Sequence, residues 1–376
     1  MGRPNGAKEL MAIWAVIMAG GSGTRFWPLS RQMRPKQFLN IGTERPLIVE
    51  TINRLKSLID VNRCTVVAGQ IHVEQLKACL PGFSDDRFVV EPCPRNTAPC
   101  IGLAAVHIAR HDPNAVLVVL PADHHITDVT TYQNLVNRAC ELAEKGHIVT
   151  LGIKPNRPET GYGYIKLKGH IGTQTKFESD GLHDVDRFVE KPDLQTAKTY
   201  LESGQYLWNS GMFFFTAQTL LDAYATHLPE VSKGLSAIEA HLNSPHYWTE
   251  LEQAFTAMPS VSIDYGIMEP ISEDVGDPQI KVLTADIGWN DVGHWGALSD
   301  YADVDDHGNV IQGRCVSVES GDNVVYADTS TVALLGVDNL VVVQTEDAIL
   351  VCPRDRAQDV RKIVSALRNS ESEGLL

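Results

Sequence analysis

The stretch from Ile13 to Ala19 (IWAVIMA), followed by Gly20 to Pro28 (GGSGTRFWP), decides the fold of this chain. Apolar residues fill the first part, which predicts a buried strand. Glycines placed directly after a strand let the backbone turn tightly and direct its N–H groups toward phosphate oxygens. Together the two parts indicate an α/β fold with a phosphate-binding loop at the end of the first strand.

This loop differs from two common phosphate-binding loops. A dinucleotide-binding fingerprint needs a third glycine where Phe26 stands, and a Walker A loop needs a Gly-Lys-Ser/Thr triplet, which does not occur here. Instead, the loop is followed by the cations Arg25, Arg31, Arg34 and Lys36. In an acidic chain, this cluster favours a polyphosphate ligand over the alternative of a tight turn followed by a solvated basic face.

Composition limits the classes of protein to consider. The chain has 376 residues, 43% of them hydrophobic, which suits one large α/β domain and a smaller appendage. The formal net charge of −15 leads us to expect neither nucleic acid nor a membrane as a partner. Seven scattered cysteines without a CxxC pair are typical of reduced thiols in a cytoplasmic protein. Residues 1–11 are expected to form a disordered lead-in, with no signal peptide or membrane span.

In the first half of the chain, short apolar runs alternate with helix-like stretches. Continuous apolar strands separated by helices predict a mostly parallel sheet that is covered on both faces. Two further strands, with a polar connection between them, are expected to pair at 162–168 and 184–190. The earlier strands are expected at 13–19, 64–68, 87–91, 115–120 and 148–152, and the helices at 47–58, 72–79, 97–110 and 132–145.

From about residue 309 to 352 the sequence becomes β-rich. Strands expected at 316–319, 332–337 and 340–345 alternate poorly in polarity, which suggests burial on more than one side. We expect a small β domain or solenoid coils, closed by a helix over 356–367. The chain then divides into a domain over 12–302 and a C-terminal domain over 303–376, whose apolar strands need the first domain or a second subunit as a partner.

The segment GGSGTRFWPLSRQMRPKQF (20–38) resembles the signature loop of sugar-nucleotide pyrophosphorylases, in the variant of the bacterial mannose-1-phosphate guanylyltransferases. Further similar motifs follow in family order, and the ordered set is specific although each motif alone is weak. They are Glu91-Pro92, Arg95-Asn96-Thr97-Ala98-Pro99, Pro121-Ala122-Asp123-His124, Gly161-Tyr162-Gly163-Tyr164-Ile165, Phe188-Val189-Glu190-Lys191-Pro192, Trp208-Asn209-Ser210-Gly211-Met212, Ser262-Ile263-Asp264-Tyr265-Gly266 and Gly288-Trp289-Asn290-Asp291-Val292-Gly293.

The resemblance implies both a fold and a reaction. The fold is α/β, with a Rossmann-like nucleotidyltransferase domain on a mostly parallel mixed sheet and a small C-terminal β-rich, β-helix-like domain. The reaction joins GTP and mannose 1-phosphate to give GDP-mannose and pyrophosphate, with Mg²⁺ as cofactor. A homodimer through the C-terminal domain is one possible assembly, and the sequence does not fix the oligomeric state.

Asp123 follows the expected strand 115–120, at the end of a parallel strand where open α/β sheets bind ligands. A carboxylate there could hold Mg²⁺, and the resemblance pairs it with Asp291. The residues alone leave another reading open, in which one aspartate caps a helix and the other stabilises a turn. His124 and His125 are expected to orient or hydrogen-bond their neighbours, because adjacent side chains point apart and no further ligands stand at zinc spacing.

The resemblance also assigns the remaining site residues. Arg25 and Lys36 neutralise the departing pyrophosphate, and Lys191 orients the attacking phosphate. Taken alone, Asn96 or Thr97 could merely cap a helix, and Glu190 with Lys191 could be a surface ion pair. The expected nucleotide-binding residues are Ala19, Gly20, Gly21, Ser22, Gly23, Thr24, Arg25, Lys36, Asn96, Thr97 and Asp123; those for the sugar phosphate are Tyr162, Gly163, Glu190, Lys191, Asn209 and Ser210.

Three other functions are open to a chain with these motifs. One is a related enzyme with another sugar or base. Another is a catalytically silent regulatory homologue, which should lack a metal carboxylate or a loop cation, whereas this chain has them all. The third is a bifunctional enzyme with a metal-binding phosphomannose isomerase domain. The C-terminal part has His307 as its only histidine, so we expect a single activity.

Overall fold

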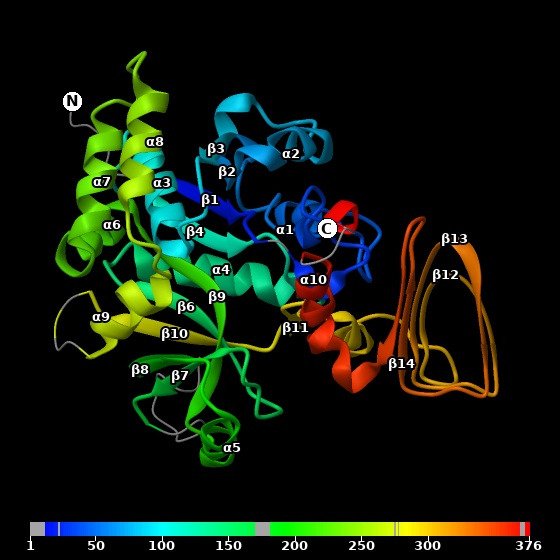
Figure 1. The fold of residues 1–376 in the computed structure, drawn as a ribbon. Coiled ribbons are helices and arrows are strands. Elements are labelled where there is room, and N and C mark those ends of the chain that lie inside the picture. Colours follow the sequence, from blue (N-terminus) through cyan, green and yellow to red (C-terminus); the bar gives the residue numbers. More distant parts are fainter. Residues whose placement is uncertain (1–11, 22, 170–180, 274–275, 277, 369–372) are drawn as a thin grey trace, which may run out of the picture.

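The computed structural model describes residues 12–21, 23–169, 181–273, 276, 278–368 and 373–376 (Figure 1). A large α/β domain carries a small stack of strands on one side, and α10 lies between the two parts (Figure 1). The expected lead-in at 1–11 and the loop residue Ser22 lie outside the described residues. No helix in the described part of the chain has the length and apolar character needed to cross a membrane.

The helices and strands of the first half lie close to the expected ranges, except that the helix expected at 47–58 ends at Asn53. In the C-terminal part, the strands expected at 316–319 and 332–337 are the ends of the longer β12 and β13. The strands are β1 (Ile13–Met18), β2 (Cys64–Gly69), β3 (Phe88–Glu91), β4 (Val116–Pro121), β5 (His125–Ile126), β6 (Ile148–Ile153), β7 (Gly163–Leu167), β8 (Leu182–Glu190), β9 (Tyr206–Thr216), β10 (Ile280–Ala285), β11 (Trp289–Asn290), β12 (Val310–Val318), β13 (Val324–Leu335), β14 (Leu340–Gln344) and β15 (Ile349–Pro353). The helices are α1 (Leu47–Asn53), α2 (Val73–Cys79), α3 (Thr97–Ala109), α4 (Val129–Ala143), α5 (Leu194–Ser203), α6 (Ala217–His227), α7 (Pro229–Glu239), α8 (Tyr247–Ala257), α9 (Glu269–Glu273) and α10 (Val360–Arg368).

Within the described residues, nine strands form one mixed sheet in the order β3-β2-β1-β4-β9-β6-β10-β8-β7. Strands β3, β2, β1 and β4 are parallel neighbours, as the alternation of strands and helices predicted. The long apolar strand β9 enters the middle of the sheet and pairs antiparallel with both β4 and β6. The expected pair β7 and β8 is antiparallel at the far edge. The mixed sheet therefore agrees with the fold class, and its parallel pairs are concentrated on the β1 side.

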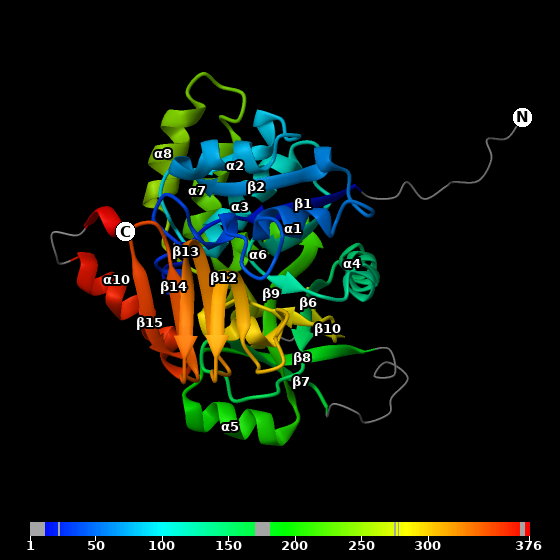
Figure 2. The same cartoon turned by 90° about the vertical axis from the view of Figure 1, so that its right-hand side faces the viewer.

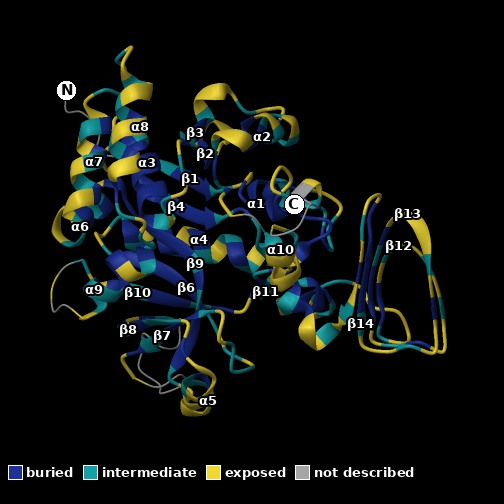
Figure 3. Ribbon diagram, viewed as in Figure 1, coloured by how far each residue is buried: buried dark blue, intermediate teal, exposed yellow. Residues whose placement is uncertain are grey.

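Alternate residues of the central strands face two separate apolar cores. Trp14 and Val16 of β1 pack with α3, α6, α7 and α8, whereas Ala15 and Ile17 pack with α1, α2 and α4. Because side chains of a strand alternate between the faces of a sheet, a fully apolar strand needs cover on both sides. Figure 3 shows the resulting buried layer running through the middle of the large domain.

The C-terminal domain is β-helix-like. Strands β12, β13 and β14 run parallel in successive coils, and β15 returns antiparallel beside β14 (Figure 2). Buried asparagines join the coils at their turns: Asn323 Nδ2 donates to Asn309 Oδ1 at 3.0 Å, and Leu340 N donates to Asn323 Oδ1 at 2.9 Å. These side chains satisfy backbone groups that a sharp corner would otherwise leave unpaired.

The expectation that these strands are buried on more than one side is confirmed for β14, where Val341 and Val343 pack in one apolar cluster and Val342 packs in another. It is wrong for the strands expected at 316–319 and 332–337, which each have an exposed face. Val316, Val318 and Leu335 are 55%, 48% and 73% exposed. Leu334, on the opposite face of β13 from Leu335, is buried in a cluster with Val325 and Val342. In the C-terminal halves of β12 and β13 the alternation is poor because apolar residues occupy both faces, although only one face is covered there.

The inner face of the C-terminal domain shares a third core with the large domain. Phe26, which lies in the signature loop, and Trp295, which follows the Asp291 turn, pack in one cluster with Val343 and Val360. The sequence expectation that the tail strands pack on the first domain is therefore confirmed. Both loops expected to carry the chemistry rest on this shared core.

Candidate functional site

The signature loop is held close to Lys36. Gly23 has a φ of 56°, and a Cβ placed on it would lie 2.5 Å from Lys36 Cβ. Ser30 Oγ donates to the Gly23 carbonyl at 2.7 Å, and Gln37 Nε2 donates to the Ala19 carbonyl at 2.8 Å. Only glycine fits this position, because a side chain would collide with Lys36 and the backbone is left-handed.

Other glycines of the loop face open space. A Cβ placed on Gly20 or Gly21 would meet no atom within 4 Å. Gly21 has a φ of 97°, so the local backbone geometry also favours glycine. The loop backbone is therefore open on the side where a phosphate chain could approach it.

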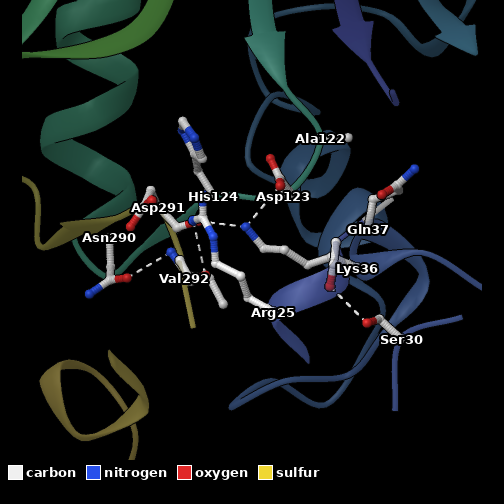
Figure 4. Close-up of polar contacts among 12 residues, drawn as sticks. Arg25, Ser30, Lys36, Gln37, Ala122, Asp123, His124, Asn290, Asp291 and Val292 are labelled. Atoms are coloured by element: carbon white, nitrogen blue, oxygen red, sulfur yellow. Dashed lines mark hydrogen bonds and ion pairs between the residues drawn. The ribbon is translucent and has the colours of Figure 1, made fainter. Parts of the chain in front are cut away.

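Lys36 connects three segments that are far apart in sequence (Figure 4). Its Nζ lies 2.8 Å from Asp123 Oδ2 and donates to the Asp291 carbonyl at 2.5 Å. Arg25 Nη1 donates to the Gly293 carbonyl at 3.3 Å. The signature loop, the end of β4 and the turn after β11 thus meet around one buried ammonium group.

The Asp291 carboxylate is positioned by its own turn and by Tyr162, the residue just before β7. The hydroxyl of Tyr162 donates to Asp291 Oδ1 at 2.5 Å. Val292 has a φ of 49°, a left-handed conformation that is costly for a β-branched residue, and its N–H is held by Asn290 Oδ1 at 2.7 Å. A Cβ on Gly293 would lie 2.9 Å from Asp291 Oδ2. Such backbone strain is typical of functional sites, where the surrounding structure fixes it.

The charges at the end of β4 are set by Lys36 and by burial. Burial opposes ionisation of Asp123, but the adjacent Lys36 outweighs it and lowers the pKa of the carboxyl. Burial lowers the pKa of His124 to about 4, so that imidazole is neutral at physiological pH. Its Nδ1 accepts a hydrogen bond from Trp289 Nε1 at 3.1 Å.

The neighbouring histidine points elsewhere. His125 stacks on Tyr301 with ring centroids 4.4 Å apart. The buried Arg54 donates to the His124 carbonyl at 2.9 Å and so supports the backbone beside Asp123. The expectation of orientation or hydrogen bonding is confirmed for His124 by its bond from Trp289, whereas the His125 ring stacks on Tyr301 and its buried Nε2 has no hydrogen-bond partner within the described part of the chain.

A hollow of about 230 Å³ opens beside Asp291. A Cβ on Gly163 would lie 2.4 Å from Glu190 Oε2, so glycine is required there for the carboxylate to enter. Glu190 Oε1 accepts from Lys191 Nζ at 2.6 Å. The hollow is lined by residues that include Thr97, Tyr162, Gly163, Glu190, Asn209 and Asp264.

Some expected site residues also have structural roles. Asn96 Oδ1 accepts from Thr97 N at 2.9 Å and caps α3, and Thr97 Oγ1 accepts from Ile263 N at 2.9 Å. Ser210 is buried, and its hydroxyl donates to the Leu151 carbonyl at 2.7 Å. The Ser210 hydroxyl therefore joins β9 to β6.

Comparison with known proteins gives the family. Residues 14–307 match the family described as nucleotidyl transferase, and residues 313–367 match the MannoseP isomerase/GMP-like beta-helix domain. The chain belongs to the nucleotidyl transferase family. The second match agrees with the β-helix-like form of the C-terminal domain.

The chain is similar to named members of this family. It is 39% identical over 361 residues to the mannose-1-phosphate guanylyltransferase of Klebsiella pneumoniae, covering 95% of this chain and 74% of that protein. It is 40% identical over 360 residues to the xanthan biosynthesis protein XanB of Xanthomonas campestris, covering 94% and 73%. The structure described as mannose-1-phosphate geranyltransferase from Thermus thermophilus is 35% identical with a TM-score of 0.83, covering 95% of this chain and all of that one.

For a nucleotidyl transferase, the sequence analysis missed two features of the hollow. Trp289 and Trp208 surround the Tyr162 ring, with centroids 5.5 Å and 5.2 Å from it. Asp264, quoted above only as part of a motif, directs a carboxylate into the hollow and accepts from Asn209 Nδ2 at 2.7 Å. Asp264 begins a π-helical turn (Asp264–Met268), a form often found at functional sites, but the local sequence has no pattern that predicts it.

Proposed function

We propose that this protein is a mannose-1-phosphate guanylyltransferase, which converts GTP and α-D-mannose 1-phosphate to GDP-mannose and pyrophosphate. The observation that carries the proposal is the placement of Lys36. Its ammonium joins the signature loop to Asp123 and Asp291, directly beside a hollow bounded by Glu190 and Asn209. A polyphosphate site and a polar hollow thus share one wall. The identity to relatives named mannose-1-phosphate guanylyltransferase supports the choice of substrates.

In the proposed reaction, a phosphate oxygen of mannose 1-phosphate attacks the α-phosphorus of GTP in line, and pyrophosphate departs. The substrate supplies the nucleophile, so the protein contributes positioning and charge neutralisation. Arg25 and Lys36 neutralise the pyrophosphate as its negative charge increases. Backbone N–H groups of Gly20, Gly21, Gly23 and Thr24 hold the phosphate chain, with the open faces of Gly20 and Gly21 giving it room. The N–H of Ala19 donates to the Val67 carbonyl at 2.9 Å, so Ala19 positions the start of the loop.

The sugar phosphate is proposed to bind on the β7–β9 side. Lys191 has a φ of 47°, and its backbone N–H donates to the Tyr162 carbonyl at 3.2 Å. This backbone hydrogen bond holds Lys191 at the edge of the hollow, where its ammonium can orient the attacking phosphate. Glu190 accepts hydrogen bonds from sugar hydroxyls and Asn209 donates to them. Tyr162 and Gly163 leave space for the ring, and Ser210 contributes through its backbone.

Guanine is proposed to lie near the start of α3. Asn96 uses its side-chain oxygen to cap the helix, so its amide N–H groups are the part that can donate to O6 or N7 of the base. Thr97 lines the hollow and joins this loop to Ile263. The nucleotide and sugar sides of the site are thereby connected through one threonine.

The carboxylates of Asp123 and Asp291 are proposed to hold Mg²⁺. Their oxygens suit this hard cation, which takes one or two protein carboxylates and fills its remaining positions with water and phosphate oxygens. A bound Mg²⁺ would supply charge stabilisation between the phosphates. Tyr162 orients Asp291, and Lys36 holds Asp123 in its ionised form.

The proposal extends to organisation and location. The nucleotidyltransferase domain covers 12–302 and the C-terminal domain 303–376, after a lead-in over 1–11. The exposed apolar outer face, with Val316, Val318 and Leu335, is the proposed contact surface of a homodimer. A cytoplasmic location is proposed because the seven cysteines are free thiols, as suits a reducing compartment.

Pyrophosphate release tests the function directly. The full-length protein is assayed with Mg²⁺ and all combinations of GTP, ATP, UTP and dTTP with mannose, glucose and galactose 1-phosphates. We expect the highest kcat/KM for GTP with mannose 1-phosphate. A higher value for another pair would assign a related transferase of different specificity. Binding of GDP-mannose without turnover of any pair would assign a regulatory homologue.

A further inference from the structure

Asp264 stands out because neither the loop chemistry nor the metal pair uses it. It is the first residue of the π-helical turn Asp264–Met268, and its carboxylate lines the hollow. The preceding residue, Ile263, is buried and is anchored to α3 through the hydrogen bond from its N–H to Thr97 Oγ1. The carboxylate is therefore carried by a fixed backbone rather than by a free loop.

Asp264 determines how the Asn209 amide is oriented. Asn209 Nδ2 donates to Asp264 Oδ1 at 2.7 Å, and Asn209 Oδ1 accepts from Gly211 N at 3.0 Å. These two bonds fix which end of the amide is the donor, and they leave one N–H of Asn209 for another partner. A carboxylate offers about four acceptor positions, and the amide of Asn209 uses one of those on Asp264.

A second carboxylate belongs to the same hollow. Glu190 Oε1 accepts from Lys191 Nζ, while Oε2 lies toward Gly163, where a Cβ would come within 2.4 Å. Burial, followed by repulsion from Glu190, raises the pKa of Asp264 to about 6. The carboxyl is still mostly ionised at pH 7.5. Holding two carboxylates near one another out of bulk water is unfavourable unless donors satisfy them.

We infer that Asp264 is a sugar-binding residue, whose carboxylate accepts a hydrogen bond from a ring hydroxyl of the sugar 1-phosphate while it orients Asn209 for a second contact. The inference rests on the proposed function and names a further residue of the same site. Glu190 and Asp264 provide the acceptors and Asn209 the donor, so the hollow requires hydroxyl groups at defined positions. A site with buried acceptors discriminates strongly against a sugar that lacks one of these hydroxyls, because the acceptor is then left unpaired.

The test follows the logic of a double-mutant cycle, in which one change is made in the protein and the other in the sugar of the substrate. Wild-type protein and Asp264→Asn are assayed with GTP and either mannose 1-phosphate or its 2-, 3-, 4- and 6-deoxy analogues. Asparagine keeps the shape and can still accept from Asn209, but it loses the charge. We expect kcat/KM for mannose 1-phosphate to fall roughly 10- to 100-fold, mainly through KM of the sugar phosphate. For the one analogue that lacks the hydroxyl bound by Asp264, the substitution should cost less than about threefold.

Controls separate this inference from a structural role and from the proposed function. Glu273→Gln, an exposed carboxylate in α9 outside the hollow, should leave all five substrates unchanged. Mannose 1-phosphate binding by calorimetry on Asp264→Asn and Asp264→Ser gives a second measurement if one variant folds poorly. An equal loss for mannose 1-phosphate and every analogue would overturn the sugar contact and leave the proposed function intact. Wild-type protein inactive with mannose 1-phosphate would overturn the proposed function itself.

Discussion

The indole N–H of Trp295 donates a 3.1 Å hydrogen bond to the backbone carbonyl of Trp27, across 268 residues of sequence. Trp295 is fully buried, and its ring packs edge-on against Phe26 at 5.1 Å and tilted against Tyr326 of β13 at 5.7 Å. It follows Asp291 by four residues. One side chain thus connects the signature loop, the turn of the proposed metal ligand and the C-terminal domain, so the small domain supports the geometry of the site.

This relationship predicts that Trp295→Phe impairs both stability and turnover. Phenylalanine keeps most of the aromatic packing but leaves the buried Trp27 carbonyl without its donor, which costs about 1–3 kcal/mol. We expect a lower urea midpoint and a reduced kcat with little change in KM for GTP. Trp248→Phe in α8 is the matched control, because Trp248 is 60% exposed. A Trp295→Phe variant with wild-type kcat would contradict the role in positioning.

The proposed metal pair predicts that Asp291→Asn abolishes turnover while the fold is retained. The loss should reach several orders of magnitude, because a bound Mg²⁺ supplies several kcal/mol of charge stabilisation. Tyr162→Phe removes only the hydroxyl that orients Asp291 and should raise the Mg²⁺ concentration needed for half-maximal rate, about 10-fold or more. Circular dichroism checks the fold. Near wild-type turnover of Asp291→Asn with Mg²⁺ present would remove Asp291 from the proposed ligands.

The loop cations are predicted to act mainly in the transition state. Negative charge increases on the departing pyrophosphate, so Arg25→Ala and Lys36→Ala should lower kcat more than they raise KM for mannose 1-phosphate. Lys36→Ala also leaves Asp123 without its ion pair, so thermal unfolding is measured beside the kinetics. Arg63→Ala, an exposed cation outside the site, is the control. A rise in both KM values at unchanged kcat would leave Arg25 and Lys36 as binding residues only.

The outer face of the C-terminal domain is predicted to form the homodimer. Val318 pairs with Leu335 across β12 and β13, and both side chains are exposed. Leu335→Lys places a charge in this apolar face and should shift the protein toward monomer in sedimentation velocity without changing its core. Ser330→Lys, at an exposed position of the same strand, should leave assembly unchanged. A wild-type protein that is monomeric at micromolar concentration would exclude this surface as a stable interface.

The sequence predicted the elements near the first loop well, because local patterns determine them. The apolar run 13–19 and the glycines after it correspond to β1 and the open loop at Gly20 and Gly21. The meeting of Asp123 with Asp291 around Lys36 could be expected only from family resemblance. Residues more than 150 positions apart carry no periodic signal of their contact.

Other features depend on tertiary contacts that no local pattern records. Asp264 enters the hollow because Thr97 anchors the preceding residue and the chain then takes a π-helical turn. The prediction of burial failed for the C-terminal halves of β12 and β13 for a different reason. Apolar residues such as Leu335 normally indicate burial, but the neighbouring Leu334 occupies the buried side of the strand and Leu335 is left on the exposed side.

The last prediction concerns a carboxyl group outside the polyphosphate site. Glu91, at the end of β3, is buried with the Cys100 thiol as its hydrogen-bond partner, and burial raises the pKa of this carboxyl to about 7. When folding raises the pKa of a carboxyl group, the group's contribution to stability is fully present at a pH where it is protonated in both the folded and the unfolded chain. For Glu91 this is the range below its ordinary pKa of 4.5. That stabilisation is lost as pH rises through the folded value near 7, because ionising Glu91 in the unfolded chain is easier than in the fold.

Glu91→Gln should therefore become more stable relative to wild type as pH rises. The shift from 4.5 to about 7 corresponds to about 3 kcal/mol in all, most of it between pH 5 and 7 and constant above about pH 7.5. Urea denaturation of both proteins at pH 5, 6, 7 and 8 gives the difference in unfolding free energy. Glu74→Gln, an exposed carboxylate in α2, is the control and should show no such trend. A constant difference between Glu91→Gln and wild type over this range would mean that Glu91 ionises equally easily in the folded and unfolded chains.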